Sequence, residues 1–146
     1  MTIRRVDPDE ALRLLREEGY AYLDVRSIPE FEDGHPEGAF NVPLLHMTPA
    51  GMLPNPDFLA VVEHAFPKDA KLVLGCKAGG RSLRAAGMLA ERGYQSVVDQ
   101  RAGWAGQTDP FGRITEPGWG PKGLPATTTT PAGHGYESLS RRALTR

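Results

Sequence analysis

The amino-acid sequence predicts an α/β sandwich, in which a parallel β-sheet lies between layers of helices. Segments typical of buried strands alternate along the chain with segments whose apolar residues have helical spacing. This alternation favours parallel strand pairs joined by right-handed crossovers. Polar and reactive side chains follow two of the expected strands, at Asp24 and Cys76, and such sheets bind ligands beyond the carboxyl ends of their strands. The 146 residues suffice for one domain with a real hydrophobic core.

The first helix is expected over residues 7–18. Asp7 is the predicted N-cap, and Pro8 occupies the first helical position, where its missing N–H costs no hydrogen bond. Gly19 is expected to end this helix before a strand over residues 20–25. The buried side of the helix is expected to consist of three apolar residues, Ala11, Leu12 and Leu15.

Two further helices and a buried strand are expected in the middle of the chain. A second helix is predicted from the cap signal Asn55-Pro56 to about Pro67. The apolar run of residues 72–74 predicts a buried strand, and a third helix is expected to follow it and end at Gly93. The residues expected to face the core are Phe58, Val61, Val62 and Ala65 in the second helix, and Leu83, Ala86 and Leu89 or Ala90 in the third.

The C-terminal part of the chain has a different composition, rich in proline, glycine and threonine, with a run of threonine at residues 127–130. Composition alone is typical of disorder. Spaced apolar residues favour instead an ordered tail that wraps the domain and ends in a short helix over residues 137–143. We therefore expect a domain of residues 1–105 and an ordered extension of residues 106–146. The expected apolar anchors of the extension are Phe111, Ile114, Trp119, Leu124 and Tyr136.

The chain's single cysteine, Cys76, lies between the apolar strand and the third helix, in the sequence CKAGGRS. Gly79 and Gly80 allow the backbone to curl so that successive N–H groups point inward, and the helix adds its positive N-terminal end. Lys77 and Arg81 add positive charge. Such surroundings favour the thiolate, which is the nucleophilic form of cysteine, and they also hold an anion.

Three blocks of motifs occur in a characteristic order along the chain. They are Leu23-Asp24-Val25-Arg26; Glu30-Phe31 with Gly34-His35, Gly38-Ala39 and Asn41-Val42-Pro43; and the loop with Cys76, Gly79 and Arg81. In this combination the chain resembles the rhodanese (thiosulfate sulfurtransferase) family of the single-domain type. Gly93-Tyr94, Val97-Val98 and Gly103-Trp104 resemble the family's last strand and its ending, although Ala102 stands where a first glycine is usual. The resemblance covers roughly residues 3–105.

The resemblance implies a three-layer sandwich with a five-stranded parallel sheet and helices on both faces. It also implies a sulfurtransferase that carries sulfur as a persulfide on Cys76, with no metal or organic cofactor. The expected substrates are a small anionic sulfur donor such as thiosulfate, or another protein's persulfide, and a thiophilic acceptor such as cyanide or a thiol. Catalysis of this kind is a double displacement, so ping-pong kinetics are expected.

Each residue of the cysteine loop has an expected part in this chemistry. Arg81 is expected to bind the anionic donor, because a guanidinium matches its oxygens in bidentate fashion. The Lys77 side chain either contacts the donor or points into solvent, and Ser82 either only caps the third helix or also bonds the sulfur. Asp24 and Arg26 are expected to support neighbouring loops. The backbone N–H groups expected to stabilise the persulfide are those of Lys77, Ala78, Gly79, Gly80, Arg81 and Ser82.

Two other functions stay open. A small phosphatase or arsenate reductase shares the cysteine-in-anion-cradle design, but protein-tyrosine phosphatases place one more residue between the cysteine and the arginine than this chain has between Cys76 and Arg81. A non-enzymatic or slow rhodanese module, acting as a sulfur carrier or in regulation, would load with sulfur yet turn over slowly. None of the four histidines, His35, His46, His64 and His134, has metal-ligand spacing, and His35 is expected to brace a loop.

Composition excludes several classes of partner. Seventeen basic and 18 acidic residues leave a net charge of −1, so the sequence predicts no nucleic-acid binding. No apolar run has the length of a membrane span or the form of a signal peptide, and no membrane association is expected. A lone cysteine excludes an internal disulfide and a cysteine-rich metal site. A reducing, cytoplasmic location is the resulting expectation.

Overall fold

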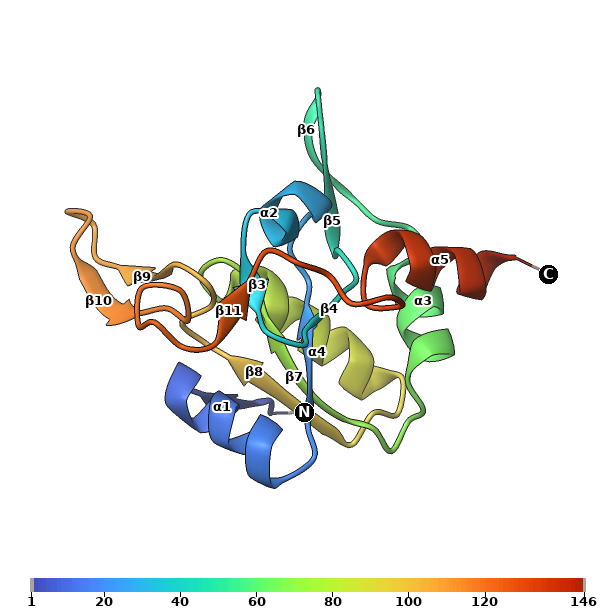
Figure 1. Cartoon of the computed structure of the whole chain (residues 1–146), viewed down its shortest axis with the longest axis horizontal. Coiled ribbons are helices and arrows are strands. Elements are labelled where there is room, and N and C mark those ends of the chain that lie inside the picture. The colour runs from blue at the N-terminus through green and yellow to red at the C-terminus, as the bar shows by residue number, and fades with distance from the viewer. Residues whose placement is uncertain (1, 146) are drawn as a thin grey trace.

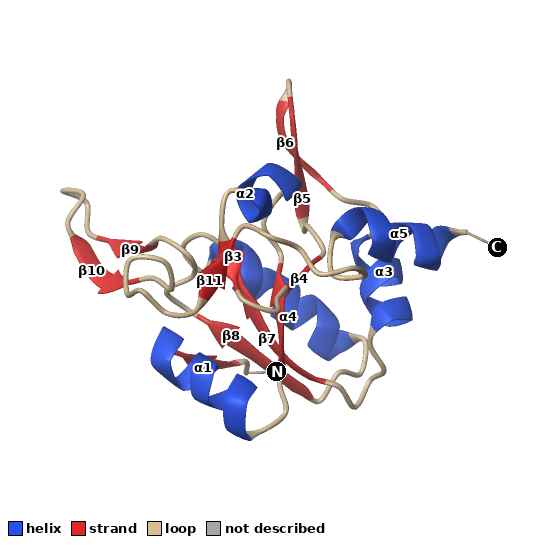
Figure 2. Cartoon of the chain, viewed as in Figure 1, coloured by secondary structure: helices blue, strands red, loops and turns tan. Residues whose placement is uncertain are grey.

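The centre of the molecule is a five-stranded parallel sheet. The computed structural model describes residues 2–145, and Figures 1 and 2 show the sheet crossing the middle of the molecule. All four neighbouring strand pairs run parallel, which confirms the predicted α/β class. In spatial order the strands are β1 (Arg4–Val6), β8 (Ser96–Gln100), β7 (Lys71–Gly75), β2 (Ala21–Asp24) and β4 (Phe40–Asn41).

Helices cover both faces of this sheet. On one face, α3 (Phe58–Ala65), α4 (Gly80–Glu91) and α5 (Tyr136–Leu144) bury their apolar sides in one hydrophobic cluster. On the other face, α1 (Pro8–Glu17) packs in a second cluster, together with Phe31 of the short helix α2 (Ile28–Glu32). Leu72, Val73 and Leu74 of β7 are fully buried between the two layers, as expected for a central parallel strand.

Helix α1 begins as predicted, with the Asp7 carboxylate accepting a hydrogen bond from the Glu10 N–H at 2.8 Å. The predicted buried side of α1 is only partly right. The buried residues of this helix are Pro8, Ala11 and Leu14, and the last two are 0% and 2% exposed. Leu12 and Leu15 are half-buried and flank that line. The side of α1 that faces the core is therefore centred on Ala11 and Leu14, which are three residues apart, and not on Leu12 and Leu15.

The other two helix starts differ slightly from the prediction. Helix α3 begins at Phe58, and Asn55 instead makes a turn before it, its side-chain oxygen accepting the N–H of Asp57 at 3.0 Å. Helix α4 begins at Gly80 in the cysteine loop, and its N-cap is Gly79, so Ser82 lies in the first turn of the helix and is not the cap that was expected. The expected core residues of α3 are buried except Ala65, which is half-buried, and in α4 the half-buried exception is Leu83.

The C-terminal segment crosses the sheet edge and ends against α3. It forms the hairpin of β9 (Gly106–Thr108) and β10 (Ile114–Pro117), pairs β11 (Ala126–Thr127) with β3 (His35–Pro36), and closes with α5 beside α3 (Figure 1). Trp119 is fully buried, and its indole N–H donates to the Pro125 carbonyl at 2.8 Å.

Two of the expected apolar anchors in this segment are wrong. Phe111 and Ile114 are 83% and 57% exposed, because the β9–β10 hairpin projects from the body of the molecule. A second hairpin, β5 (Leu45–Thr48) with β6 (Gly51–Pro54), also projects. Among residues 2–145, no helix has the length and apolar character that crossing a bilayer requires.

The register of the sheet brings two of the motifs together. Asp24 of β2 lies directly opposite Gly75 of β7, so the segments that follow both strands leave the sheet side by side. The carboxyl ends of parallel strands form one edge of the sheet, where ligands bind in open α/β folds. Cys76 and the Asp24-Val25-Arg26 motif therefore meet at this edge.

Candidate active site

The sulfur of Cys76 is held by polar groups of its own loop. The Gly79 N–H donates to Sγ at 3.1 Å, and the Ser82 hydroxyl lies 3.4 Å from Sγ. Gly79 has φ +100°, a conformation that glycine adopts without strain, and a Cβ there would lie 2.3 Å from the Arg101 carbonyl oxygen. The loop therefore has its observed shape because glycine occupies position 79.

The segment that follows β8 in the chain, residues 103–105, holds the other side of the loop. The N–H groups of Trp104 and Ala105 donate to the carbonyls of Cys76 and Lys77 at 2.8 and 2.9 Å. Gly103 packs so tightly that a Cβ would lie 2.5 Å from both of those carbonyl oxygens. These two carbonyls are thereby bound by amides of the segment after β8, while the Gly79 amide donates to the sulfur.

Cys76 itself is only 2% exposed. Lys77, Ala78 and Gly80, which follow it in the loop, are exposed. These three residues therefore form the solvent-exposed side of the loop. Beneath the loop, a Cβ at Gly75 would lie 1.8 Å from the hydroxyl oxygen of Tyr22, so a larger residue there would displace this buried ring.

Arg81 forms a bidentate ion pair with Glu30 of α2. Its two terminal nitrogens donate to the two Glu30 oxygens at 2.8 and 3.0 Å, and both side chains are 19% exposed. Hydrogen bonding to Glu30 raises the pKa of Arg81. Sequence reasoning did not assign Glu30 to the site. The signal that could have found it is the capping-box pattern, since Glu30 also accepts from the Ser27 N–H and hydroxyl.

Acid is expected to weaken the native state through Glu30. Burial alone would raise the pKa of Glu30, but hydrogen bonds from Arg81 and Ser27 outweigh it and lower the pKa to about 2, from an ordinary value of 4.5. Because the folded-state pKa is depressed, the stabilisation is present above the ordinary value and is lost as the pH falls toward 2. Urea unfolding across this range should show a shallower acid dependence for Glu30→Gln than for the wild type. An unchanged dependence would refute this; Glu91→Gln, at the exposed end of α4, is the control.

Asp24 and Arg26 form a buried unit behind the loop. Arg26 Nη2 donates to Asp24 at 2.7 Å and to the Gly34 carbonyl at 2.6 Å, and its guanidinium lies 5.1 Å from the centre of the Trp104 ring. Both charged residues are less than 4% exposed. Because the Trp104 N–H binds the Cys76 carbonyl, this unit packs against the segment that shapes the loop. This geometry fits the supporting role expected for both residues.

A cavity of about 180 Å³ opens beside the loop. Lys77 of the cysteine loop is one of the residues that line it. The cavity combines positive and negative groups with an aromatic wall. The lining residues are Arg26, Glu30, Asp33, Lys77 and Trp104.

Asp99 is a buried carboxylate near the loop that sequence reasoning missed. It lies opposite Leu74 in the β7–β8 register, and its Oδ2 accepts from Arg5 Nε at 2.8 Å. Its Oδ1 has no hydrogen-bond partner within residues 2–145. Burial raises the pKa of Asp99, although the hydrogen bond from Arg5 partly opposes the shift. A charged residue within an apolar strand was the available signal.

Two further sequence features are explained by the structure. Ala102 has no positive φ, so its position does not require the glycine that is usual there. Gln100 Oε1 accepts the N–H groups of Ala102 and Gly103.

The His35 ring contacts the carbonyl oxygens of Phe31 and Thr129, at 2.6 and 2.9 Å, in agreement with a bracing role. In the part of the chain that the structure describes, no group of three or more His, Cys, Asp or Glu side chains could hold a metal ion.

The chain is similar to a known protein family and to several curated proteins. The family model for the rhodanese-like domain matches residues 7–108. The senescence-associated protein DIN1 of Raphanus sativus is 39% identical over 102 residues, which are 70% of this chain and 56% of that protein. Thiosulfate sulfurtransferase 16, chloroplastic, of Arabidopsis thaliana is 41% identical over 87 residues, 60% of this chain and 72% of that protein.

Among solved structures, Rv0390 of M. tuberculosis has a TM-score of 0.74 at 24% identity, covering 88% of this chain and 100% of that one. This likeness concerns the fold. The chain spans little more than half the length of the first two curated relatives that it matches.

Proposed function

Since the chain belongs to the family of rhodanese-like domains, we propose that it is a sulfurtransferase that carries sulfane sulfur on Cys76. The donor is thiosulfate or a persulfide, and the acceptor is a thiophile such as cyanide or a thiol. The observation that carries this proposal is the position of Sγ, which the Gly79 N–H and the Ser82 hydroxyl approach while neighbouring loop carbonyls are bound elsewhere. A name within the family supports it, because one relative is called a thiosulfate sulfurtransferase.

The proposed reaction has two displacement steps. In the first, the Cys76 thiolate attacks the outer sulfur of thiosulfate, the S–S bond of the donor breaks, and its electron pair leaves with sulfite. The terminal sulfur of the resulting persulfide carries the negative charge, and the Gly79 amide and neighbouring loop amides stabilise it. In the second, cyanide attacks that terminal sulfur, thiocyanate leaves, and the thiolate is restored. No proton has to move between substrates in either step.

Steady-state kinetics with thiosulfate and cyanide test this function. Because sulfite leaves before cyanide reacts, double-reciprocal plots at several cyanide concentrations should be parallel. Lines that intersect would show that both substrates bind together and would exclude the persulfide route. Absence of thiocyanate with every donor tried would exclude sulfur transfer to cyanide.

Arg81 is proposed to bind the donor while its guanidinium stays paired with Glu30. Both terminal nitrogens already donate to Glu30, so the donor has to use their remaining N–H groups and Nε. Lys77 adds a second positive charge at the wall of the adjacent cavity. Together these groups favour a small anion over a neutral donor.

Removing the Arg81 charge should therefore weaken donor binding more than turnover. For Arg81→Ala we expect the KM for thiosulfate to rise about tenfold or more, as for loss of one charge-assisted contact, with kcat changed less. Glu30→Gln should leave this KM unchanged or lower, because it frees the guanidinium. The double variant separates the two effects, since it leaves no unpaired carboxylate. An unchanged KM in stably folded Arg81→Ala would assign Arg81 a purely structural role.

The burial of Cys76 favours a slow sulfur carrier as the second candidate function. At 2% exposure, the sulfur is poorly placed for rapid exchange with free small molecules. A carrier would take up one sulfur per chain but release thiocyanate far more slowly than it loads. Pre-steady-state kinetics that measure loading and release separately distinguish the two candidates.

A further inference from the structure

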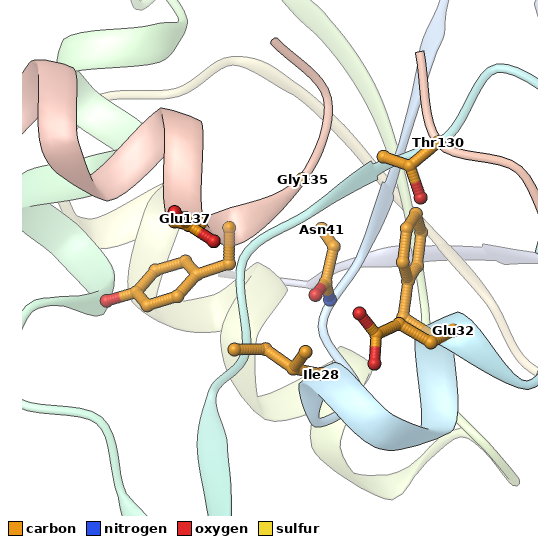
Figure 3. A pocket seen from close by; sticks show the side chains of 8 residues that line it. Ile28, Glu32, Asn41, Thr130, Gly135 and Glu137 are labelled. Atoms are coloured by element: carbon orange, nitrogen blue, oxygen red, sulfur yellow. The ribbon is translucent and has the colours of Figure 1, made fainter. Parts of the chain in front are cut away.

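A second cavity lies on the C-terminal side of the molecule and shares no lining residue with the cavity beside Lys77. Its volume is about 210 Å³, and its walls come from α2, from the end of β4 and from the start of α5 (Figure 3). The residues that matter below are Ile28, Phe31, Glu32, Asn41, Tyr136 and Glu137. The sulfur chemistry proposed above does not use this space.

The inner end of this cavity carries an amide oxygen that forms no hydrogen bond with the protein. Asn41 is only 1% exposed. Its Nδ2 donates to the carbonyls of Asp24 and Arg26, both at 3.0 Å, which identifies the other atom of the amide as Oδ1. Within residues 2–145, Oδ1 accepts no hydrogen bond from the protein, and Figure 3 shows the Asn41 amide among the side chains that line the cavity. An amide oxygen that faces the cavity can accept a hydrogen bond from a ligand that brings a donor.

The remaining walls combine negative charge with apolar and aromatic surface. The carboxylates of Glu32 and Glu137 lie on opposite sides of the cavity, and no Lys, Arg or His lines it (Figure 3). Glu137 also forms an ion pair with Arg141 at 2.7 Å, and both of these side chains are more than half exposed. Phe31, Ile28 and Tyr136 supply the apolar part.

The cavity is formed by well-anchored segments. The Asn41 N–H donates to the His134 carbonyl at 2.9 Å, and the His134 ring stacks on Phe40 at 3.8 Å. On the other side, the Tyr136 hydroxyl contacts the buried side chain of Asn55 at 3.1 Å. Binding therefore requires little ordering of the protein, which lowers the cost of association.

We propose that this cavity binds an aliphatic guanidinium group. A guanidinium brings several N–H donors, which suit an amide oxygen and carboxylates together, and its flat face packs on aromatic rings. At about 30 Å³ for each water molecule, the volume of about 210 Å³ corresponds to a ligand of about seven non-hydrogen atoms. n-Butylguanidinium, with eight, is close to this size and is the probe of choice.

Titration of ¹⁵N-labelled protein with n-butylguanidinium tests the proposal. We expect saturating shifts of the Asn41 side-chain amide and of backbone amides in α2 and at the start of α5, with a Kd of about 1 mM, the order expected for so small a ligand. The amides of Lys77 and Gly79 should not move. n-Butylurea, the neutral isostere, should bind at least about tenfold more weakly because it lacks the charge. Equal binding of the urea, or shifts without saturation, would overturn the proposal.

Variants locate the interaction. Glu32→Gln combined with Glu137→Gln should weaken n-butylguanidinium binding about tenfold, since each loses one charged contact at an exposed rim. Glu91→Gln removes one negative charge far along α4 and is the matched control, expected to leave the Kd unchanged. Undiminished binding by the double variant, with its spectrum otherwise intact, would place the guanidinium elsewhere.

A blocked tripeptide with a central arginine distinguishes the two possible sources of the group. If this tripeptide binds at least about tenfold more tightly than n-butylguanidinium, the guanidinium belongs to an arginine of a partner chain, because the flanking residues then add contacts. Equal or weaker binding assigns it to a free small molecule. Failure of both probes would refute this site without bearing on Cys76, because sulfur transfer is measured separately.

Discussion

Replacing Cys76 by serine is expected to abolish sulfur loading. Intact-mass spectrometry of the wild-type protein after thiosulfate treatment should show a gain of one sulfur atom, about 32 Da, which cyanide then removes. The variant should show no gain, because a serine hydroxyl is not ionised at neutral pH and does not attack a sulfane sulfur as a thiolate does. Thiocyanate formation should fall by at least about a thousandfold, the scale seen when a covalent nucleophile is lost.

Two controls make this result specific. Ser82→Ala keeps the thiol and removes only the hydroxyl at 3.4 Å from Sγ, so it should still load with sulfur. Hydrolysis of a phosphate ester and reduction of arsenate should stay at background in the wild type, since turnover of either would favour the phosphatase or arsenate reductase alternative. A persistent 32 Da adduct on the serine variant would show that Cys76 is not the carrier.

Gly79→Ala is expected to collapse the loop. The Cβ would lie 2.3 Å from the Arg101 carbonyl oxygen and 3.1 Å from Arg5 Nη2, at a φ of +100° that non-glycine residues rarely adopt. We expect a loss of about 2–4 kcal/mol of unfolding free energy from strain and displaced contacts. The Gly79 N–H would also leave Sγ, so kcat/KM should drop by about a hundredfold or more, as for loss of one well-placed donor. Urea unfolding and thiocyanate assays measure the two effects.

The neighbouring glycine supplies the matched control. A Cβ at Gly80 would have no heavy atom within 4 Å, its φ is not positive, and it is the first residue of α4. Gly80→Ala should therefore leave activity unchanged and leave stability equal or slightly higher, because alanine favours a helix. If the two variants behaved alike, the special backbone of position 79 would not matter.

Much of this protein could be predicted from sequence because the signals are local. The Asp7 cap of α1, the buried run of β7 and the strand-to-helix turn at Cys76 depend on residues within a few positions of one another, and the structure confirms all three. The parallel order of these strands follows from the helices between them. Predictions failed where a local pattern had no partner in space, as for Phe111 and Ile114 on a projecting hairpin.

The α/β class, the family motifs and the reactive loop follow from the amino-acid sequence, because backbone propensity and apolar spacing act over short distances. Three features emerge only in the folded molecule: Glu30 pairs with the Arg81 guanidinium, Cys76 is nearly buried, and the C-terminal segment closes a second cavity around Asn41. These features join segments far apart in the chain. Which of the many possible long-range contacts form is settled by the packing of the whole domain, and no short pattern encodes that outcome.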